Sequence, residues 1–593
     1  MCGICGELRF DGRPPDPAVV QLMTERLARR GPDGEGRYLD GPVALGHRRL
    51  AVIDLSERAA QPMVDAASGL ALVFNGTIYN FPELRKELQA RGHVFTSSGD
   101  TEVILRAYAE WGEACPERLQ GMFAFAIWDS KRQQLFLARD RFGIKPLYYS
   151  ITRDAIRFAS TSQALLVAGD VDTAIDPVGL HRHFTLHGVV PAPRTVLRGL
   201  RKLAPGHSLV VEPNRRRTLS RYWQLDALTC TDKLSEWEWI EATHDALRRA
   251  VERRRVIADV PVGILLSGGL DSSLLVALLA EAGCSDLLTF SVGFEDEPEE
   301  KGNEFEYSDL VAELYDTRHR RIHIPNSEVL SRLPEAVDEM SEPMVGQDAV
   351  AFYLLGERVS KEVKVVQSGQ GADEVFAGYF WYQQMHNAHG TDIDRFKPLY
   401  FDRTHDEMHA TLSAQYQGPD YSTPMVAQGL AASHGKRFLN RVLAFDVTTL
   451  IVDDPVKRVD NMTMAWGLEA RVPFLDQELV ELVTCMPPEI KLKSGGKHPL
   501  KVIARDLLPD IVIDRPKGYF PVPSLKYVRG RTLDFMRGVL ESQACRERGL
   551  YQRNYVNALL NNPEQSHTPL LGSKLWHLTL LEFWLQRNVD ISP

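Results

Sequence analysis

The sequence has few cysteines, no long apolar run and no net positive charge. Its 593 residues include seven cysteines, and a low, odd count fits free thiols in a reducing compartment better than a set of disulfides. No apolar run approaches the ~18 residues of a membrane helix, and the first residues lack the basic region and apolar core of a signal peptide. We therefore expect a cytoplasmic protein without membrane partners.

The net charge of −10 argues against general affinity for nucleic acid. Basic clusters at 214–217 and 248–256 are interpreted as solvated surfaces, as charge runs usually are. The composition, 44% hydrophobic and 25% charged, is that of a soluble globular protein. The length predicts two to four domains.

The chain opens with Cys2-Gly3-Ile4-Cys5, a C-x-x-C pair. A zinc site would need further ligands at short spacing, and the other cysteines are scattered. A redox pair would sit after a strand at the start of a helix, which this context does not match. A third reading is that the initiator methionine is removed, so that the free α-amine of Cys2 takes the thiol proton and makes a nucleophile. A buried, unreactive thiol is the alternative.

Five motifs follow Cys2 in order. They are "RGPDGEG" (30–36), "GHRRLAVIDL" (46–55), "LVFNGTIYNFPELR" (72–85), "SSGDTEVIL" (97–105) and "GMFAFAIWD" (121–129). Together with Cys2 they resemble the class II glutamine amidotransferase domain. The resemblance implies an N-terminal-nucleophile (αββα) fold, with two antiparallel sheets between helical layers, at residues 2–215.

The same resemblance implies a role for each of several residues. Cys2 would be the nucleophile, and Asn75 with the backbone N–H of Gly76 would form the oxyanion hole that a tetrahedral intermediate requires. Arg49 would hold the carboxylate of glutamine, and Asp100 its ammonium group.

Thr77 departs from the family pattern. The family commonly has Glu at this position, where it also holds the substrate ammonium group, so half of the clamp is altered. Either Asp100 alone suffices, or Thr77 also binds glutamine through its hydroxyl. For the preceding Asn75-Gly76 pair, the alternative to an oxyanion hole is an Asn-Gly hairpin turn.

A linker is predicted at 216–236 and a second domain at 237–593. An amphipathic helix at about 238–256 precedes a buried strand at 262–266, a glycine-rich turn and a helix rich in Leu and Ala. Neither GxxxxGKS/T nor GxGxxG occurs, which argues against P-loop kinases and dinucleotide folds. "SGGLDSS" instead resembles the pyrophosphate loop of the ATP pyrophosphatases. Alternating strands and helices predict a parallel sheet with ligands at the carboxyl ends of its strands.

This second resemblance implies an ATP site with two metal ligands. The ATP-binding residues would be Leu265, Ser267, Gly268, Gly269, Asp271, Ser272, Val292, Ser368 and Gly369. Asp271 and Asp373 match the Mg²⁺ ligands of the family. Lys517 matches its catalytic lysine, and Lys497 is a weaker candidate for that role.

Over nearly its whole length the chain resembles the glutamine-hydrolysing asparagine synthetases. The resemblance implies that ammonia made at Cys2 travels through a buried passage and attacks an acyl-adenylate, giving an amide and AMP. In "LEARVPFLD" (468–476), a further signature, we expect Arg471 and Asp476 to be structural. The expected cofactors are ATP and Mg²⁺, and the expected partners are small molecules. A homodimer is left open, and no nucleic acid is expected.

These motifs do not specify the acceptor carboxylate. Trp466 stands where asparagine synthetases usually have a smaller or polar residue, and Gln370 where several have Glu. With "GYFPVPSLKYVRG" (518–530) and "GSKLWHLTLLEFWLQ" (572–586), the chain looks most like the N-acetylglutaminylglutamine amidotransferases, which amidate a capped dipeptide to make an osmoprotectant. Aspartate is the alternative acceptor, and a core position is the alternative for Trp466. A non-catalytic glutamine or nucleotide sensor is the alternative to an enzyme.

Overall fold

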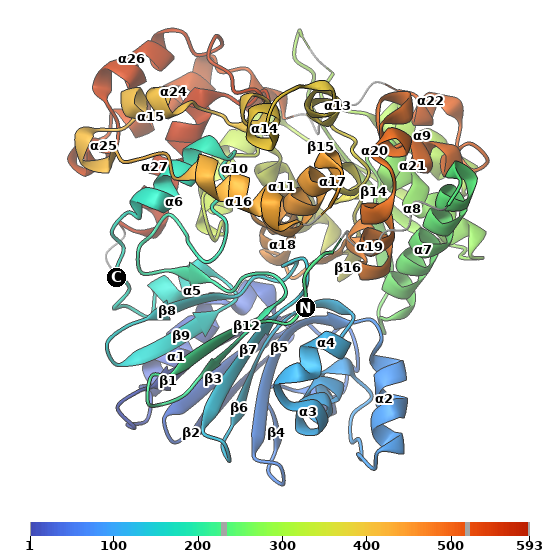
Figure 1. The fold of residues 1–593 in the computed structure, drawn as a ribbon, viewed down its shortest axis with the longest axis vertical. Helices are drawn as coiled ribbons and strands as arrows, with labels where there is room; N and C mark the ends of the chain where they lie inside the picture. Colours follow the sequence, from blue (N-terminus) through green and yellow to red (C-terminus); the bar gives the residue numbers. More distant parts are fainter. Residues whose placement is uncertain (1, 227–233, 300, 434, 516–521, 591–593) are drawn as a thin grey trace.

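The computed structural model describes residues 2–226, 234–299, 301–433, 435–515 and 522–590. The chain forms two parts, and Figure 1 shows the blue-to-teal N-terminal part below the green-to-red C-terminal part. None of the described helices is both long and apolar enough to cross a lipid bilayer.

Two antiparallel sheets form the centre of the N-terminal part, each with six strands in the described ranges. The first has the order β10 (Arg201–Lys202), β8 (Tyr148–Ile151), β9 (Ala155–Ala159), β1 (Gly3–Arg9), β3 (Val43–Arg49) and β2 (Gly34–Asp40). The second has the order β12 (Arg217–Arg221), β11 (His207–Val211), β7 (Gln134–Arg139), β6 (Gly121–Asp129), β5 (Leu70–Ile78) and β4 (Met63–Asp65). The predicted antiparallel sheets are confirmed.

Most strands of these sheets carry apolar side chains on both faces, so each face must pack against another layer of the protein. Leu8 of the first sheet and Trp128 of the second lie in the apolar layer between the sheets. Helices cover the outer faces: α1 (Pro17–Arg26) and α5 (Ser162–Leu166) the first sheet, α2 (Phe81–Ala90) and α3 (Asp100–Trp111) the second. This is the αββα arrangement that the sequence predicts.

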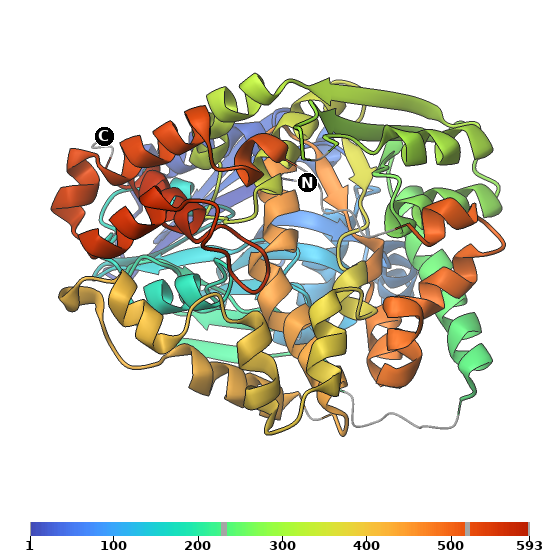
Figure 2. The same cartoon turned by 90° about the horizontal axis from the view of Figure 1, so that it is seen from above.

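The C-terminal part is built on a parallel sheet, as predicted. Its order is β15 (Arg318–Ile324), β14 (Leu288–Phe294), β13 (Val262–Leu265), β16 (Val365–Gln367) and β17 (Glu469–Arg471). After β13 the chain turns at Gly269 into α8 (Leu270–Glu281), which is apolar all round and therefore buried. Figure 2 shows the red C-terminal helices at one end of this part and the green strands of the sheet toward the other.

The boundary between the two parts differs from the predicted linker at 216–236. Strand β12 lies within that range and pairs with β11, so the second sheet continues beyond residue 215. The sequence did not indicate β12 because all five of its residues are exposed and show no apolar alternation. Helix α7 (Glu236–Val256) begins at a capping box formed by Ser235 and Glu238. Residues 227–233 lie outside the described ranges.

The described cysteines differ in one case from the expectation of free thiols. Cys2, Cys5, Cys115, Cys284 and Cys545 are free. Cys485 is disulfide-bonded, so the expectation is wrong for this residue. A cysteine count does not reveal which thiols the fold brings within bonding distance.

Candidate functional site

A small cavity of about 30 Å³ lies where the two sheets of the N-terminal part approach the C-terminal part. Its lining is Cys2, Arg49, Leu50, Val52, Ile53, Ala59, Gln61, Phe74, Gly76, Thr77, Asp100 and Thr101. The register explains the grouping, because β1 pairs with β3 at Gly3 and Arg48, which brings Cys2 and Arg49 together. The cavity thus unites five of the residues predicted for glutamine hydrolysis.

Cys2 is almost fully buried, with 7% of its surface exposed. Its backbone N–H donates to Asn75 Oδ1 at 3.0 Å, and its carbonyl oxygen accepts from Arg30 Nε at 3.4 Å. Burial raises the pKa of the Cys2 thiol above its ordinary value. A nucleophilic thiolate at this position therefore requires a base close to the sulfur.

Asn75 and Gly76 lie inside strand β5, opposite Ala124 and Phe123 of β6. This position excludes the hairpin turn that Asn-Gly also suggests. Asn75 is fully buried, and its Nδ2 has no hydrogen-bond partner among the described residues. A Cβ at Gly76 would lie 2.1 Å from the carbonyl oxygen of Met122, so the site accepts only glycine. The side-chain amide of Asn75 thus offers a free donor beside Cys2.

Arg49 and Asp100 are both fixed by backbone groups. The Arg49 guanidinium donates to the carbonyl of Ser56 at 3.0 Å and to that of Asp54. Asp100 lies in the first turn of α3 and accepts from the N–H of Ile78 at 3.0 Å. Burial raises the pKa of Asp100 to about 6, and the nearby Glu469 carboxylate adds to this rise.

Thr77 connects this cavity to the second domain. Its hydroxyl donates to Glu469 Oε1 at 3.2 Å, although the two residues are 392 positions apart. Glu469 begins strand β17, is 0% exposed and pairs with Arg471 Nε at 2.6 Å. Burial opposes ionisation, but cations around it, among them Arg471 and Lys145, lower the pKa of Glu469 to about 2. Glu469 lies within the "LEARVPFLD" signature, but the signature alone does not indicate its contact with Thr77.

The structural roles expected for Arg471 and Asp476 match their contacts. Arg471 donates to the carbonyls of Arg254 and Ile257 at 2.6 and 2.7 Å. Asp476 caps α19 (Gln477–Cys485) and pairs with Arg254 Nη1 at 2.8 Å. Arg471 thus joins β17 to the end of α7, and Asp476 joins the start of α19 to it.

A second, much larger cavity of about 850 Å³ lies at the carboxyl ends of β13, β14 and β16. Of the residues predicted to bind ATP, those that line it are Leu265, Ser267, Gly269, Asp271, Ser272, Val292, Ser368 and Gly369. Gly268 is not part of the lining; its φ is +74°, and a Cβ there would lie 2.6 Å from Ser308 N. It therefore shapes the turn that presents its neighbours.

Asp271 and Asp373 come together at Lys497. The Lys497 ammonium lies 2.6 Å from Asp271 Oδ2 and 2.8 Å from Asp373 Oδ1. Burial disfavours the charged form of Lys497, but the two carboxylates outweigh this effect and raise its pKa above the ordinary value. Two carboxylates that converge on one positive charge also suit a divalent cation. Lys517 lies outside the described residues, so its predicted role stays a prediction. Lys497, the second candidate, lies between the two carboxylates.

The two residues predicted to shape the acceptor pocket lie apart. Gln370 lines the larger cavity. Trp466 is not part of that lining; it packs on Tyr353, with ring centroids 5.2 Å apart, and under the Arg29 guanidinium of the first domain. The position of Trp466 against the hydrophobic core fits the packing alternative rather than a place in the acceptor pocket.

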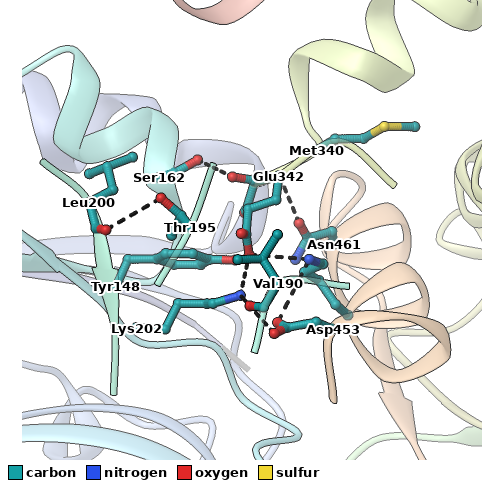
Figure 3. A network of polar contacts seen from close by, with 12 residues as sticks. Tyr148, Ser162, Val190, Thr195, Leu200, Lys202, Met340, Glu342, Asp453 and Asn461 are labelled. Atoms are coloured by element: carbon teal, nitrogen blue, oxygen red, sulfur yellow. Dashed lines mark hydrogen bonds and ion pairs between the residues drawn. The ribbon is translucent and has the colours of Figure 1, made fainter. Parts of the chain in front are cut away.

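Buried charges join the two domains next to these cavities. Lys202 of the first domain, which is 1% exposed, lies 2.8 Å from Glu342 Oε2 and 2.7 Å from Asp453 Oδ2 of the second. Figure 3 shows this ammonium between the two carboxylates, with Tyr148 beside them. Asp460 similarly accepts from Lys145 and Arg30, both at 3.0 Å. A buried charge without its partner is costly in free energy, so separating the two domains at these ion pairs is unfavourable. The pairs therefore fix the domains relative to each other.

Comparisons with known proteins cover both parts of the chain. Residues 1–223 match the family described as "Glutamine amidotransferase domain", and residues 242–586 match "Asparagine synthase". Asparagine synthetase (glutamine-hydrolyzing) 3 of Bacillus subtilis (strain 168) is 32% identical, with 100% of both chains covered. Asparagine synthetase (glutamine-hydrolyzing) 1 of the same strain is 30% identical, over 100% of this chain and 97% of that protein. Amidase chry2 of Gibberella zeae is 28% identical, over 88% of this chain and 89% of its own length.

Proposed function

Because the chain belongs to the family of glutamine-hydrolysing asparagine synthetases, we propose that it adenylates a carboxylate with ATP and converts it to an amide with ammonia from glutamine. Members of this family are carbon–nitrogen ligases that take nitrogen from glutamine and form AMP, and the chain belongs to this class of enzyme. The observation that carries the proposal is the contact between Thr77 and Glu469, because it joins the smaller cavity to the domain that contains the larger one.

In the smaller cavity, Cys2 is the proposed nucleophile. Its α-amine, free once the initiator methionine is removed, takes the thiol proton, and the sulfur attacks the amide carbon of glutamine. The unpaired Nδ2 of Asn75 and the N–H of Gly76 then donate to the oxyanion. Ammonia leaves, and water hydrolyses the thioester to release glutamate. Arg49 and Asp100 hold the ends of the substrate, with Thr77 beside Asp100.

In the larger cavity, the turn before α8 holds the phosphates of ATP. Backbone N–H groups at a helix N-terminus favour anions, and Gly269 and Ser267 lie there. The acceptor carboxylate attacks the α-phosphorus and pyrophosphate leaves; ammonia then attacks the acyl carbon and AMP leaves. Asp271 and Asp373 would hold Mg²⁺, which neutralises charge on the departing pyrophosphate. Lys497 adds a positive charge beside both carboxylates.

The ammonia is proposed to pass along strands β16 and β17. Glu469 at the start of β17 contacts Thr77 in the smaller cavity, and the Arg471 carbonyl at its end accepts from the N–H of Ser368, which lines the larger one, at 2.9 Å. A parallel strand advances about 3.3 Å per residue, so a short path suffices. Shelter matters because ammonia in water at neutral pH is almost entirely ammonium, which is not nucleophilic.

For the acceptor we propose a molecule larger and less charged than aspartate, with N-acetylglutaminylglutamine as the leading candidate and osmoprotectant synthesis as the role. Gln370 lines the cavity without a negative charge, and Trp381, Tyr400 and Trp576 make part of its wall aromatic. The cavity residues Arg458 and Arg515 are each paired with carboxylates of the chain, which disfavours a small substrate with two carboxylates. Aspartate is the second candidate, because the similar B. subtilis proteins are named asparagine synthetases.

The deciding experiment measures pyrophosphate release with ATP, Mg²⁺ and glutamine, and compares the two acceptors. We expect turnover of N-acetylglutaminylglutamine and little release with aspartate. Efficient turnover of aspartate alone would assign the chain to asparagine synthesis. Binding of glutamine or ATP without pyrophosphate release, over a panel of carboxylates, would support a sensor instead.

A further inference from the structure

Three side chains outside both catalytic sets meet beside the larger cavity, which one of them, His187, lines. His187 follows α6 (Pro177–Thr185), Asp402 follows α14 (Asp392–Tyr400), and His577 lies in the first turn of α27 (Lys574–Asn588). Asp402 Oδ2 lies 3.2 Å from His187 Nδ1 and 3.4 Å from His577 Nδ1. The three ligand atoms all lie within 4.8 Å of one another.

The cluster is buried, and several of its polar atoms have no hydrogen-bond partner among the described residues. The side chains of Asp402 and His577 are 0% and 1% exposed, and that of His187 is 17% exposed. Among the described residues, Asp402 Oδ1 and both ring nitrogens of His577 have no hydrogen-bond partner. A buried carboxylate with one unpaired oxygen next to an unpaired imidazole is costly in free energy. A further group bound between these side chains would remove this cost.

We propose that His187 Nδ1, His577 Nδ1 and Asp402 Oδ2 bind a divalent transition metal ion, preferentially Zn²⁺. A tetrahedral ion with bonds of about 2.0–2.1 Å separates its ligand atoms by about 3.3 Å, close to the two distances found here. Two imidazoles and one carboxylate form a three-ligand zinc site with a fourth position for another group, whereas Mg²⁺ and Ca²⁺ prefer oxygen ligands alone.

The surroundings support this site. The N–H of Asp402 donates to the carbonyl of Thr185 at 3.0 Å, which fixes the carboxylate. The cations Arg403 and Lys574 act on His577 through their charge and would limit the affinity for the ion.

Glycine at position 572 leaves space beside both imidazole rings, on the Nε2 side of His577. A Cβ at Gly572 would lie 2.9 Å from His577 Nε2 and 3.2 Å from His187 Cε1, so a larger residue would close the space between the rings. His187, Gly572 and Ser573 all line the larger cavity. A water molecule or a cavity ligand completes the coordination.

The site also joins the two domains. His187 comes from the first predicted domain, and Asp402 and His577 from the second. An ion bound by all three would add a link between domains that does not depend on the reaction at either cavity. The proposal is thus independent of the proposed function, and its test needs no substrate.

The test uses the full chain without a histidine tag, stripped with a chelator and titrated with Zn²⁺. We expect one equivalent to bind and to raise the unfolding temperature. In Asp402→Asn and His577→Gln, binding should weaken at least about 100-fold, while the control His319→Gln, altered outside the cluster, should bind as the unaltered chain does. Equal binding by all variants, or no zinc-dependent shift at micromolar zinc, would overturn the proposal.

A spectroscopic measurement covers the case in which these variants do not fold. Co²⁺ in the unaltered chain should give the visible absorption of a tetrahedral nitrogen and oxygen site. It should lack the thiolate charge-transfer bands that binding at Cys2 or another cysteine would produce. Thiolate bands, or the spectrum of octahedral aqueous cobalt, would place the ion elsewhere and reject the site.

Discussion

The Thr77 hydroxyl of the first domain donates its hydrogen bond to Glu469 of the second, with 3.2 Å between Oγ1 and Oε1. Because the hydrogen points to Glu469, the lone pairs of the oxygen remain to accept a bond from another donor. Glu469 stays ionised, since its pKa is lowered to about 2. Thr77 thus offers an acceptor backed by a negative charge at the position where the family commonly has a carboxylate.

The first prediction concerns this hydroxyl. Thr77→Val keeps the shape but removes the acceptor, and loss of one hydrogen bond to a charged group should raise KM for glutamine about 10-fold or more. Thr77→Ser should restore most of the affinity. Glutaminase assays across glutamine concentrations measure this, with ammonia-dependent synthesis as the control. An unchanged KM in Thr77→Val would remove Thr77 from the substrate site.

The second prediction concerns Cys2. Cys2→Ala should abolish glutamine-dependent synthesis and leave ammonia-dependent synthesis, because the adenylating site lies in the other domain. Amide formation is assayed with each nitrogen source. Intact-mass measurement of the unaltered protein tests whether Cys2 is the first residue of the mature chain. Equal loss with both sources would contradict the two-site scheme.

The third prediction is a pH dependence set by Asp100, whose pKa is about 6. As the pH falls through 6, this carboxyl gains a proton and no longer attracts the substrate ammonium group. The kcat/KM for glutamine should therefore decline below pH 6, approaching tenfold per pH unit. Asp100→Asn should have low activity without this inflection. Because burial raises the pKa of Asp100 from 3.8 to about 6, the free energy of unfolding falls as the pH rises between these values and stays lower above pH 6.

The fourth prediction separates the two chemistries. Asp271→Asn or Asp373→Asn should reduce AMP and pyrophosphate formation at least about 100-fold, while basal glutaminase activity persists. Product analysis by chromatography with labelled ATP makes the comparison. Release of ADP and phosphate by the unaltered protein would show that the reaction is not an adenylation.

The fifth prediction tests the domain interface. Lys202→Met removes one of the two ammonium groups that pair with Glu342 and Asp453, the other being Lys457. The free energy of unfolding should therefore fall by up to about 3 kcal/mol. Lys364→Met, which removes an exposed interdomain pair with Asp33, should cost less than about 1 kcal/mol. Chemical denaturation measures both. The ratio of glutamate released to amide formed should rise in Lys202→Met and stay unchanged in Lys364→Met. If Lys202→Met has the same ratio as the unaltered protein, this interface does not control ammonia transfer.

The sequence allowed much of the fold and of both cavities to be predicted, because the relevant residues lie in short motifs at strand ends. Asn75 and Gly76 share one strand, and Ser267 through Ser272 occupy one turn and the start of a helix. Local spacing places such residues without knowledge of the rest of the chain.

Contacts between distant segments could not be predicted in this way. Nothing in the spacing of Thr77 and Glu469, or of His187, Asp402 and His577, indicates that they meet, because the packing of whole domains brings them together. The substitution at Trp466 likewise does not reveal that its ring packs on Tyr353. A motif also gives residue types and not the carboxylates around them, so the position of Lys497 between Asp271 and Asp373 is added by the structure, while Lys517 stays a prediction.

Strand β17 is three residues long and is held at both ends, by Glu469 to Thr77 and by the Arg471 carbonyl to the N–H of Ser368. We infer that a short strand fixed in this way transmits a displacement from one end to the other. A ligand that shifted Ser368 in the larger cavity would then also shift the Thr77 hydroxyl in the smaller one. Occupancy of one cavity would thus alter the affinity of the other.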